Sequence, residues 1–237
     1  PSRRRLPEAV RQQALALVAE HYADFGPTLA AEKLLERHHL GLSRESLRRL
    51  MIGAGLWQPR ARQVKHRRWR QRRACVGELV QVDTSIHDWF EGRGPQVVLI
   101  SLIDDATGRV FRRFYPTDST VTNMTHLRDY LARYGRPLAL YGDGASHFLT
   151  TRQPTVDEQL AAQPPLTQIG RALRELDIAW IPAHSPQAKG RIERSFQTAQ
   201  DRLVKELRLA GISDLATANG FLEEYDQRVT NQRFAIA

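Results

Sequence analysis

Three carboxylates stand on separate parts of the chain, each beside a segment that predicts regular structure. Asp83 lies inside a strand-like run, Asp143 ends the apolar segment 137–143, and Glu193 lies near the start of a helical pattern. Carboxylate oxygens are the ligands that hard divalent cations prefer in proteins. If folding brings the three side chains together, they predict a site for Mg²⁺ or Mn²⁺.

The helical pattern around Glu193 indicates where its side chain points. Its apolar positions recur with a period near 3.6 residues, which is typical of a buried helix face. They are Ile192, Phe196, Ala199, Leu203 and Leu207. Lys189, Glu193 and Gln197 are four residues apart and form a polar column beside that face. We therefore expect Glu193 to point along the rim of the core.

Each acidic residue also has a simpler interpretation. An aspartate at the end of a strand is commonly a turn or cap residue, and Asp104 with Asp105 is interpreted that way. Asp88 is expected on the strand face opposite Asp83. Glu193 alone would be a solvated partner of Lys189. Only the joint placement of all three carboxylates favours catalysis.

Three motifs around these carboxylates resemble those of integrase-core (DDE) transposases. They are Gln81-Val82-Asp83-Thr84-Ser85, Tyr141-Gly142-Asp143-Gly144, and Ser185-Pro186-Gln187-x-Lys189-Gly190-x-x-Glu193-Arg194. The third motif is the most specific, and the resemblance spans about 78–233. The segments 87–94 and 200–208 resemble the ISNCY-type group of bacterial insertion sequences.

The resemblance implies an RNase H-like catalytic fold and an enzyme that cuts and joins DNA ends with a divalent metal. In the two-metal reaction, two ions about 4 Å apart polarise the attacking and the leaving oxygen. Asp83, at the sheet centre, would bridge two Mg²⁺ or Mn²⁺ ions, with Asp143 on one and Glu193 on the other. The residues after Asp143 depart from the family pattern, so contacts to the DNA end near Gly144 and His147 are less secure than metal binding. His87 is expected to be structural.

Positive charge is concentrated in the front third of the chain. Residues 1–76 hold 17 Lys and Arg against 6 Asp and Glu, a balance of +11, whereas residues 77–237 hold 18 against 20, a balance of −2. A basic front implies a polyanionic partner, and double-stranded DNA is the expected one. The resemblance adds a homodimer or a higher homo-oligomer assembled on that DNA.

The front segment 1–57 predicts three short helices, over 7–22, from Pro27, and after a cap at Ser43. Leu29, Ala30, Leu34 and Leu35 are expected to be buried in the second. The third presents Arg44, Arg48 and Arg49 outward, which favours a helix-turn-helix domain that binds DNA. The alternative is a plain three-helix bundle with solvated arginines.

Residues 58–76 are interpreted as a basic linker that follows DNA phosphates. Its stretch 58–73 holds eight Lys and Arg and no acid, and has little to pack. The expected DNA contacts in the linker are Arg60, Arg62, Lys65, Arg67, Arg68, Arg70, Arg72 and Arg73. Lys189 and Arg194, beside Glu193, complete the predicted set of DNA contacts.

From residue 77 the pattern changes to an α/β domain, 77–237. Strands are expected over 78–90, 96–104, 109–115, 138–142 and 178–182, and helices over 120–134, after a cap at Thr167, and over about 187–210 and 214–232. The residues expected to face inward are Met124, Leu127, Leu131 and Tyr134 in the first of these helices and Ile169, Leu173 and Leu176 in the second. This order predicts three antiparallel strands followed by parallel ones, with helices on both faces. The polar segment 149–168 is interpreted as a surface insertion.

Composition limits the remaining classes. A single cysteine, Cys75, excludes an intramolecular disulfide and a cysteine-based zinc site. No apolar run is long enough to cross a membrane and no signal-peptide pattern opens the chain, so we expect a cytoplasmic, nucleoid-associated bacterial protein. The chain begins without methionine, and we expect a C-terminal part of the full protein to be missing. The alternatives to a transposase are a catalytically inactive, transposon-derived DNA-binding protein or repressor, and a general nuclease of the same fold.

Overall fold

The computed structural model describes residues 6–59, 71–143, 146–160, 164–183 and 190–236. The chain divides into two compact units, Pro1–His66 and Arg67–Ala237, and each is described by itself. The division falls inside the basic stretch in which the sequence predicts a linker. Among the described residues, no helix has the length and apolar character needed to span a membrane.

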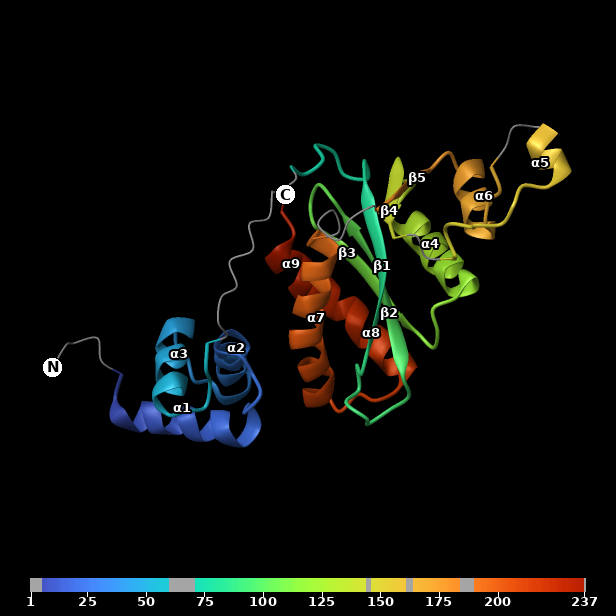
Figure 1. Cartoon of the computed structure of the whole chain (residues 1–237). Helices are drawn as coiled ribbons and strands as arrows, with labels where there is room; N and C mark the ends of the chain where they lie inside the picture. The colour runs from blue at the N-terminus through green and yellow to red at the C-terminus, as the bar shows by residue number, and fades with distance from the viewer. Residues whose placement is uncertain (1–5, 60–70, 144–145, 161–163, 184–189, 237) are drawn as a thin grey trace. The chain divides into compact units, whose positions relative to one another are not determined.

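The first unit contains three helices: α1 (Glu8–His21), α2 (Pro27–His38) and α3 (Arg44–Gly53) (Figure 1). The caps predicted from the sequence are present, because Pro27 occupies the first turn of α2 and the Ser43 hydroxyl accepts a hydrogen bond from the Ser46 amide. The core of the unit holds Ala14, Val18, Tyr22, Phe25, Leu29, Ala30, Leu34, Leu47 and Met51.

One burial prediction in the first unit is wrong. Leu35 is 57% exposed, whereas Lys33 is buried and donates a hydrogen bond to Glu36. Leu34 faces the core, and a side chain one position along a helix points about 100° away from its neighbour. The apolar stripe of α2 is therefore narrower than its composition suggests.

The second unit is built on a five-stranded mixed sheet of order β3-β2-β1-β4-β5. Its strands are β1 (Val80–His87), β2 (Val97–Asp104), β3 (Val110–Tyr115), β4 (Ala139–Gly142) and β5 (Ala179–Pro182). The first three are antiparallel neighbours, and β4 and β5 run parallel to β1. Every residue of β2 is buried, because both faces of the sheet are covered. The predicted fold class is confirmed.

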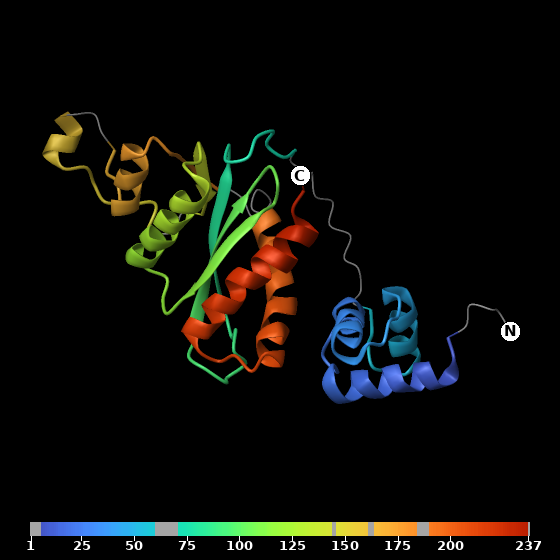
Figure 2. The same cartoon turned by 180° about the vertical axis from the view of Figure 1, so that it is seen from behind.

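Helices cover both faces of this sheet (Figures 1 and 2). On one face, α7 (Gly190–Leu209) and α8 (Leu215–Tyr225) pack over β1, β2 and β3, around Trp89, Phe90, Leu99 and Phe114. On the other face, α4 (Thr120–Tyr134) and α6 (Gln168–Glu175) enclose a second core around Val82, Leu102, Leu127, Leu140, Ile169 and Leu173. The predicted cap of α6 is present, since the Thr167 hydroxyl accepts from the Gly170 amide.

The end of the chain returns to the sheet through a π-helical turn. This turn, η2 (Asp226–Thr230), continues α8 and leads into α9 (Asn231–Phe234). Arg112 on β3 donates two hydrogen bonds to the carboxylate of Asp226 and one to the Thr230 hydroxyl, and both members of the ion pair are buried. The pair fixes the end of α8 over the sheet.

Three details of the second unit differ from the prediction. Tyr134 and Leu176 are expected inward but are 37% and 40% exposed, because they stand at the final residue of α4 and the C-cap of α6, beyond the part of each helix that packs on the sheet. The insertion 149–168 contains a short helix, α5 (Val156–Leu160), which lies beyond α6 at the β5 side of the sheet (Figure 1). Its apolar residues, Val156 and Leu160, are exposed, so this helix buries no apolar face.

Candidate active site

Asp83 lies on the central strand of the sheet, on the face that α7 covers. Side chains alternate along a strand, so Gln81, Asp83 and Ser85 share one face of β1. The Gln81 side chain accepts a hydrogen bond from the Ile192 amide (3.4 Å), and the Ser85 hydroxyl accepts one from Gln200 (3.1 Å), both on α7. Asp83, half-buried between them, therefore faces the first turns of α7.

Asp143 lies beside Asp83 at the end of the neighbouring strand. The parallel pairing of β1 with β4 matches Val80 to Leu140 and Gln81 to Tyr141. Continued by two residues, the same register brings Asp143 level with Asp83. Asp143 directly follows β4 and is exposed. Asp83, in the middle of β1, and Asp143, directly after β4, are therefore neighbours across the parallel pair.

A close contact behind β4 determines how the chain reaches Asp143. A Cβ atom on Gly142 would lie 2.6 Å from Cη2 of Trp180 and 3.0 Å from Cγ1 of Val82, so only glycine fits against these side chains. The Trp180 ring in turn stacks on Phe148, with centroids 4.3 Å apart and planes 5° apart. The glycine of the second motif thus has a packing reason, since it allows β5 to lie close to the end of β4.

Glu193 lies in the first turn of α7 and is half-buried. The helix buries Ile192 and Phe196 against the sheet, as the periodicity predicts. Gln200 is seven residues after Glu193, about two turns, so the two share one flank of α7. Because Gln200 bonds to Ser85, that flank faces β1, and Glu193 points to the side of the helix on which Asp83 lies.

The three carboxylates thus lie on neighbouring parts of the second unit, in β1, directly after β4 and in the first turn of α7, without forming a closed ligand set. Among the described residues, which include all three, no group of three His, Cys, Asp or Glu side chains is close enough to hold a metal ion. Like charges repel, so carboxylates brought to within ligand distance of one another need a cation or a shared proton between them. The donor set, three carboxylates with no nitrogen or sulfur ligand, is of the type that suits Mg²⁺ or Mn²⁺.

The acidic residues that have simpler interpretations are placed by their hydrogen bonds. Asp88 is exposed and accepts from the Gly92 amide in the turn after β1. Asp104 accepts from the amide and the hydroxyl of Thr107, which is the predicted turn role. Asp105 differs, because it is fully buried and accepts from both Gln81 and Arg191.

The role of Asp105 was not predicted from the sequence. The sequence signal was Gln81, a polar residue between the apolar residues Val80 and Val82. The amide of a buried glutamine needs a buried hydrogen-bond partner. Arg191, two residues before Glu193, forms an ion pair with Asp105.

The predicted DNA contacts of α3 are partly engaged within the helix. Arg44 and Arg49 are exposed and Arg48 is half-buried. Arg48 and Arg49 both donate to the Glu45 carboxylate, and these hydrogen bonds lower the pKa of Glu45 to about 2. The exposed pairs orient the guanidinium groups but contribute little to stability.

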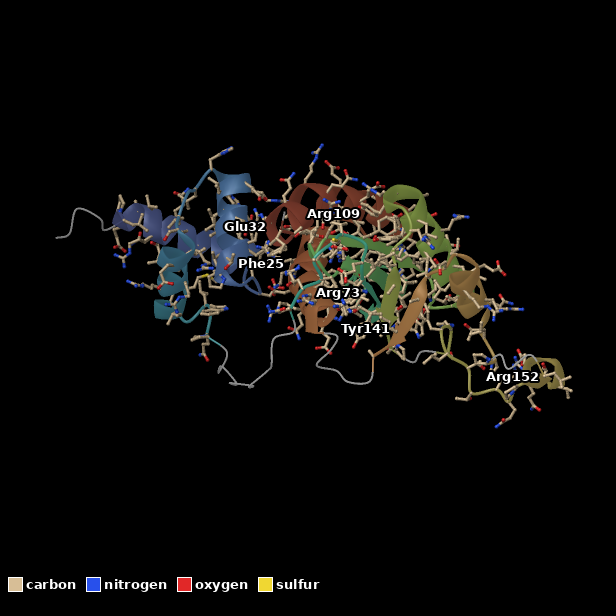
Figure 3. The ribbon with its side chains drawn as sticks, turned by 90° about the horizontal axis from the view of Figure 1, so that it is seen from above. Phe25, Glu32, Arg73, Arg109, Tyr141 and Arg152 are labelled. Carbon is tan, nitrogen blue, oxygen red and sulfur yellow. The ribbon has the colours of Figure 1, made fainter. Side chains whose placement is uncertain are left out.

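The other predicted contacts fall into three sets. Arg72 and Arg73 bind the second unit itself: Arg72 donates to the carbonyls of Asp105 and Ala106, while Arg73 donates its amide to the Asp105 carboxylate and its guanidinium to Glu78 (Figure 3, where Arg73 is labelled). Arg194 is exposed on α7. The remaining contacts lie outside the described residues; they are Arg60, Arg62, Lys65, Arg67, Arg68, Arg70 and Lys189.

Comparison with known proteins shows which class of protein the chain resembles. The chain is 46% identical over all of its 237 residues to "Putative transposase y4bF" of Sinorhizobium fredii. It is 37% identical over 165 residues, or 69% of the chain, to the transposase for insertion sequence IS1202 of Streptococcus pneumoniae. The resemblance to insertion-sequence transposases is thereby confirmed, while the ISNCY-type assignment stays a prediction. The chain spans half the length of the first relative and 34% of the second.

The fold has a counterpart among solved structures. A chain of the simian T-cell lymphotropic virus intasome, in complex with PP2A regulatory subunit B56 gamma, matches 91% of this chain and 68% of its own length, with a TM-score of 0.51 and 14% identity. At that identity the likeness shows the fold alone, which is the RNase H-like fold. No family model matches the chain.

Proposed function

We propose that this chain forms the DNA-binding and catalytic part of a transposase that cleaves transposon ends and joins them to target DNA. The observation that carries the proposal is the parallel pairing of β1 with β4, whose register, continued by two residues, leads to Asp83 and Asp143. Helix α7 is hydrogen-bonded to β1 on either side of Asp83. Glu193 lies on the flank of α7 that faces this strand. The relationship to two curated transposases supports the same activity.

The reaction consists of two displacements at phosphorus. In the first, a water oxygen attacks the phosphodiester at the transposon end, the bond from phosphorus to the 3′ oxygen breaks, and the end keeps a 3′ hydroxyl. In the second, this hydroxyl attacks a target phosphodiester, and the target's 3′ oxygen leaves. Both steps need charge stabilisation at the same two positions, so one site serves both.

Asp83, Asp143 and Glu193 would hold the ions, because β1 is paired with β4, which Asp143 directly follows, and is hydrogen-bonded to the first turn of α7. Two Mg²⁺ or Mn²⁺ ions, when bound, supply charge stabilisation at the attacking and leaving oxygens. The protein contributes the placement of the carboxylates, since two of them stand on paired strands and the third on a helix bonded to that pair.

DNA affinity is assigned to the basic front of the chain. Helix α3, with Arg44, Arg48 and Arg49, would serve as the recognition helix of a helix-turn-helix. The basic linker would contact phosphates, and Arg194 with Lys189 would contact the DNA near the cleaved bond. Lys189 precedes Glu193 by one turn in sequence, and a lysine ammonium suits this task because it acts as a compact point charge. The complex on DNA would be a homodimer or a higher homo-oligomer.

A catalytically inactive DNA-binding protein is the second candidate, because the basic front of the chain would bind DNA with or without a working metal site. Cleavage of a labelled terminal-repeat duplex in Mg²⁺, set beside metal-free binding of the same duplex, separates the two. We expect Asp83→Asn, Asp143→Asn and Glu193→Gln each to abolish cleavage and joining and to preserve binding, because amides are poor ligands for hard cations.

The matched control is Asp88→Asn, an exposed aspartate five residues after Asp83 that accepts a hydrogen bond within a turn. This variant is expected to cleave as the unmodified protein does. Binding without any metal-dependent cleavage by the unmodified protein would favour the inactive alternative. Full cleavage by the Glu193→Gln variant would remove that residue from the site.

A further inference from the structure

A buried carboxylate lies at the back of the proposed site, at the end of β2. Asp105 is fully buried and collects donors from three separate segments. Its Oδ1 accepts from Gln81 Nε2 at 2.9 Å and from the Arg191 guanidinium, and its Oδ2 accepts from the Arg73 amide at 2.9 Å. Arg73, Gln81, Asp105 and Arg191 are called the Asp105 cluster below.

Gln81 connects this cluster to the start of α7. Its amide donates to Asp105, and this bond directs the amide oxygen toward the backbone N–H of Ile192. Ile192 is the third residue of α7, and the first four amides of a helix have no acceptor inside the helix. Gln81 therefore caps α7 from the neighbouring strand, although the two residues are 111 positions apart in sequence.

Arg191 makes the second connection. Its side chain is only 19% exposed, and its ion pair joins the second residue of α7 to the turn after β2. A buried carboxylate needs a partner to remain charged, and a guanidinium holds a carboxylate in a defined geometry. The orientation of the first turn of α7 is thus set by two bonds that end on the same carboxylate oxygen.

The positions of these bonds relative to the carboxylates of the site suggest their purpose. Gln81 is two residues before Asp83 on the same strand face, and Arg191 and Ile192 directly precede Glu193. We propose that Asp105 is a positioning residue for the transposase site: by holding Gln81 and Arg191 together, it sets the distance from Asp83 to Glu193. This inference rests on the proposed function.

The test compares Asp105→Asn with Asp104→Asn in the whole protein. The two aspartates are adjacent and both buried. The Asp104 carboxylate, however, accepts from Thr107 in its own turn and from the Gly77 amide, and neither donor belongs to α7. An asparagine at 105 presents an N–H group where the carboxylate accepts from Arg191 or Arg73. We expect both variants to unfold more easily.

Hydrogen exchange on the metal-free protein gives a readout that does not depend on activity. Amides of the first turn of α7, followed in a peptide covering 190–196, are expected to exchange at least about tenfold faster in Asp105→Asn and to be unchanged in Asp104→Asn. Gln81→Met, which keeps the length of the side chain but neither of its hydrogen bonds, should give the same change. It also serves as the test if Asp105→Asn does not fold.

End cleavage then links position to function. We expect Asp105→Asn to reduce cleavage at least about tenfold and to raise the Mg²⁺ concentration needed for half-maximal cleavage, with Asp104→Asn close to the unmodified protein. Equal exchange in the two variants, or full cleavage by Asp105→Asn, would overturn the positioning role. Asp83→Asn, measured alongside, tests the proposed function separately: if it cleaves normally, the site assignment fails while the exchange data still decide whether Asp105 orders α7.

Discussion

The buried histidine of α4 makes the stability of the second unit depend on pH. His126 is 1% exposed, and its ring stacks on Phe111 with centroids 4.9 Å apart. Its Nδ1 lies 3.3 Å from the Tyr115 hydroxyl, which is a neutral partner. Burial lowers the pKa of His126 to about 3, and the opposing effect of the nearby Asp129 is smaller. The imidazole is therefore neutral in the folded chain well below neutral pH.

The size of the effect follows from proton linkage. An unfolded histidine has a pKa near 6.5. Between about pH 6.5 and about pH 3 the unfolded chain binds one proton more than the folded chain, so the free energy of unfolding falls by about 1.4 kcal/mol per pH unit. The stabilisation is complete above about pH 6.5 and is lost progressively as the pH falls toward about 3. From pH 7 to pH 5 the loss from His126 is about 2 kcal/mol.

Urea denaturation at pH 7 and pH 5, followed through the fluorescence of Trp89, which is buried in the same unit, measures this loss. We expect His126→Phe to be less stable at pH 7 than the unmodified chain, because the Tyr115 contact is gone, but to lose about 2 kcal/mol less on going to pH 5. His87→Gln, a change at an exposed histidine, should retain the full pH dependence. An equal loss in His126→Phe and the unmodified chain would refute the reasoning.

Three further predictions concern the fold and the division of labour. Asp226→Asn should lower the free energy of unfolding by about 3–5 kcal/mol in urea denaturation, because it leaves the buried Arg112 guanidinium without its counter-charge; a decrease below about 1 kcal/mol would contradict this. Gly142→Ala should cost about 1–3 kcal/mol through the clash with Trp180 and should slow end cleavage, and an unchanged melting temperature would show that the ring moves aside freely. Residues 71–237 alone should bind end DNA weakly, and the slope of their salt dependence should be shallower by about 0.9 for each phosphate that the front unit neutralises; binding as tight as that of the whole chain would disprove the role of the front unit.

Much of the fold could be predicted from the sequence because the relevant signals are local. The strand over 97–104 is apolar at nearly every position, and the caps at Ser43 and Thr167 act within three residues of themselves. The period of the apolar residues in 190–209 depends only on helix geometry, so Ile192 and Phe196 could be assigned to the core in advance. For the same reason the carboxylates could be placed inside a strand, at a strand end and near the start of a helix.

The tertiary structure decided what depends on contacts between distant segments. Asp105 has the sequence surroundings of a turn residue. It becomes the centre of a buried cluster only because folding brings Arg191, 86 positions later, into hydrogen-bond contact with it. Leu35 has the composition of a core residue, but no element of the first unit covers it. The level of Asp143 beside Asp83 follows from the register of two strands separated by β2, β3 and α4. The local sequence pattern shows which face of a helix or strand is apolar. Strand pairing and side-chain burial depend on which other segment packs against that face, and the neighbouring residues in sequence do not specify that segment.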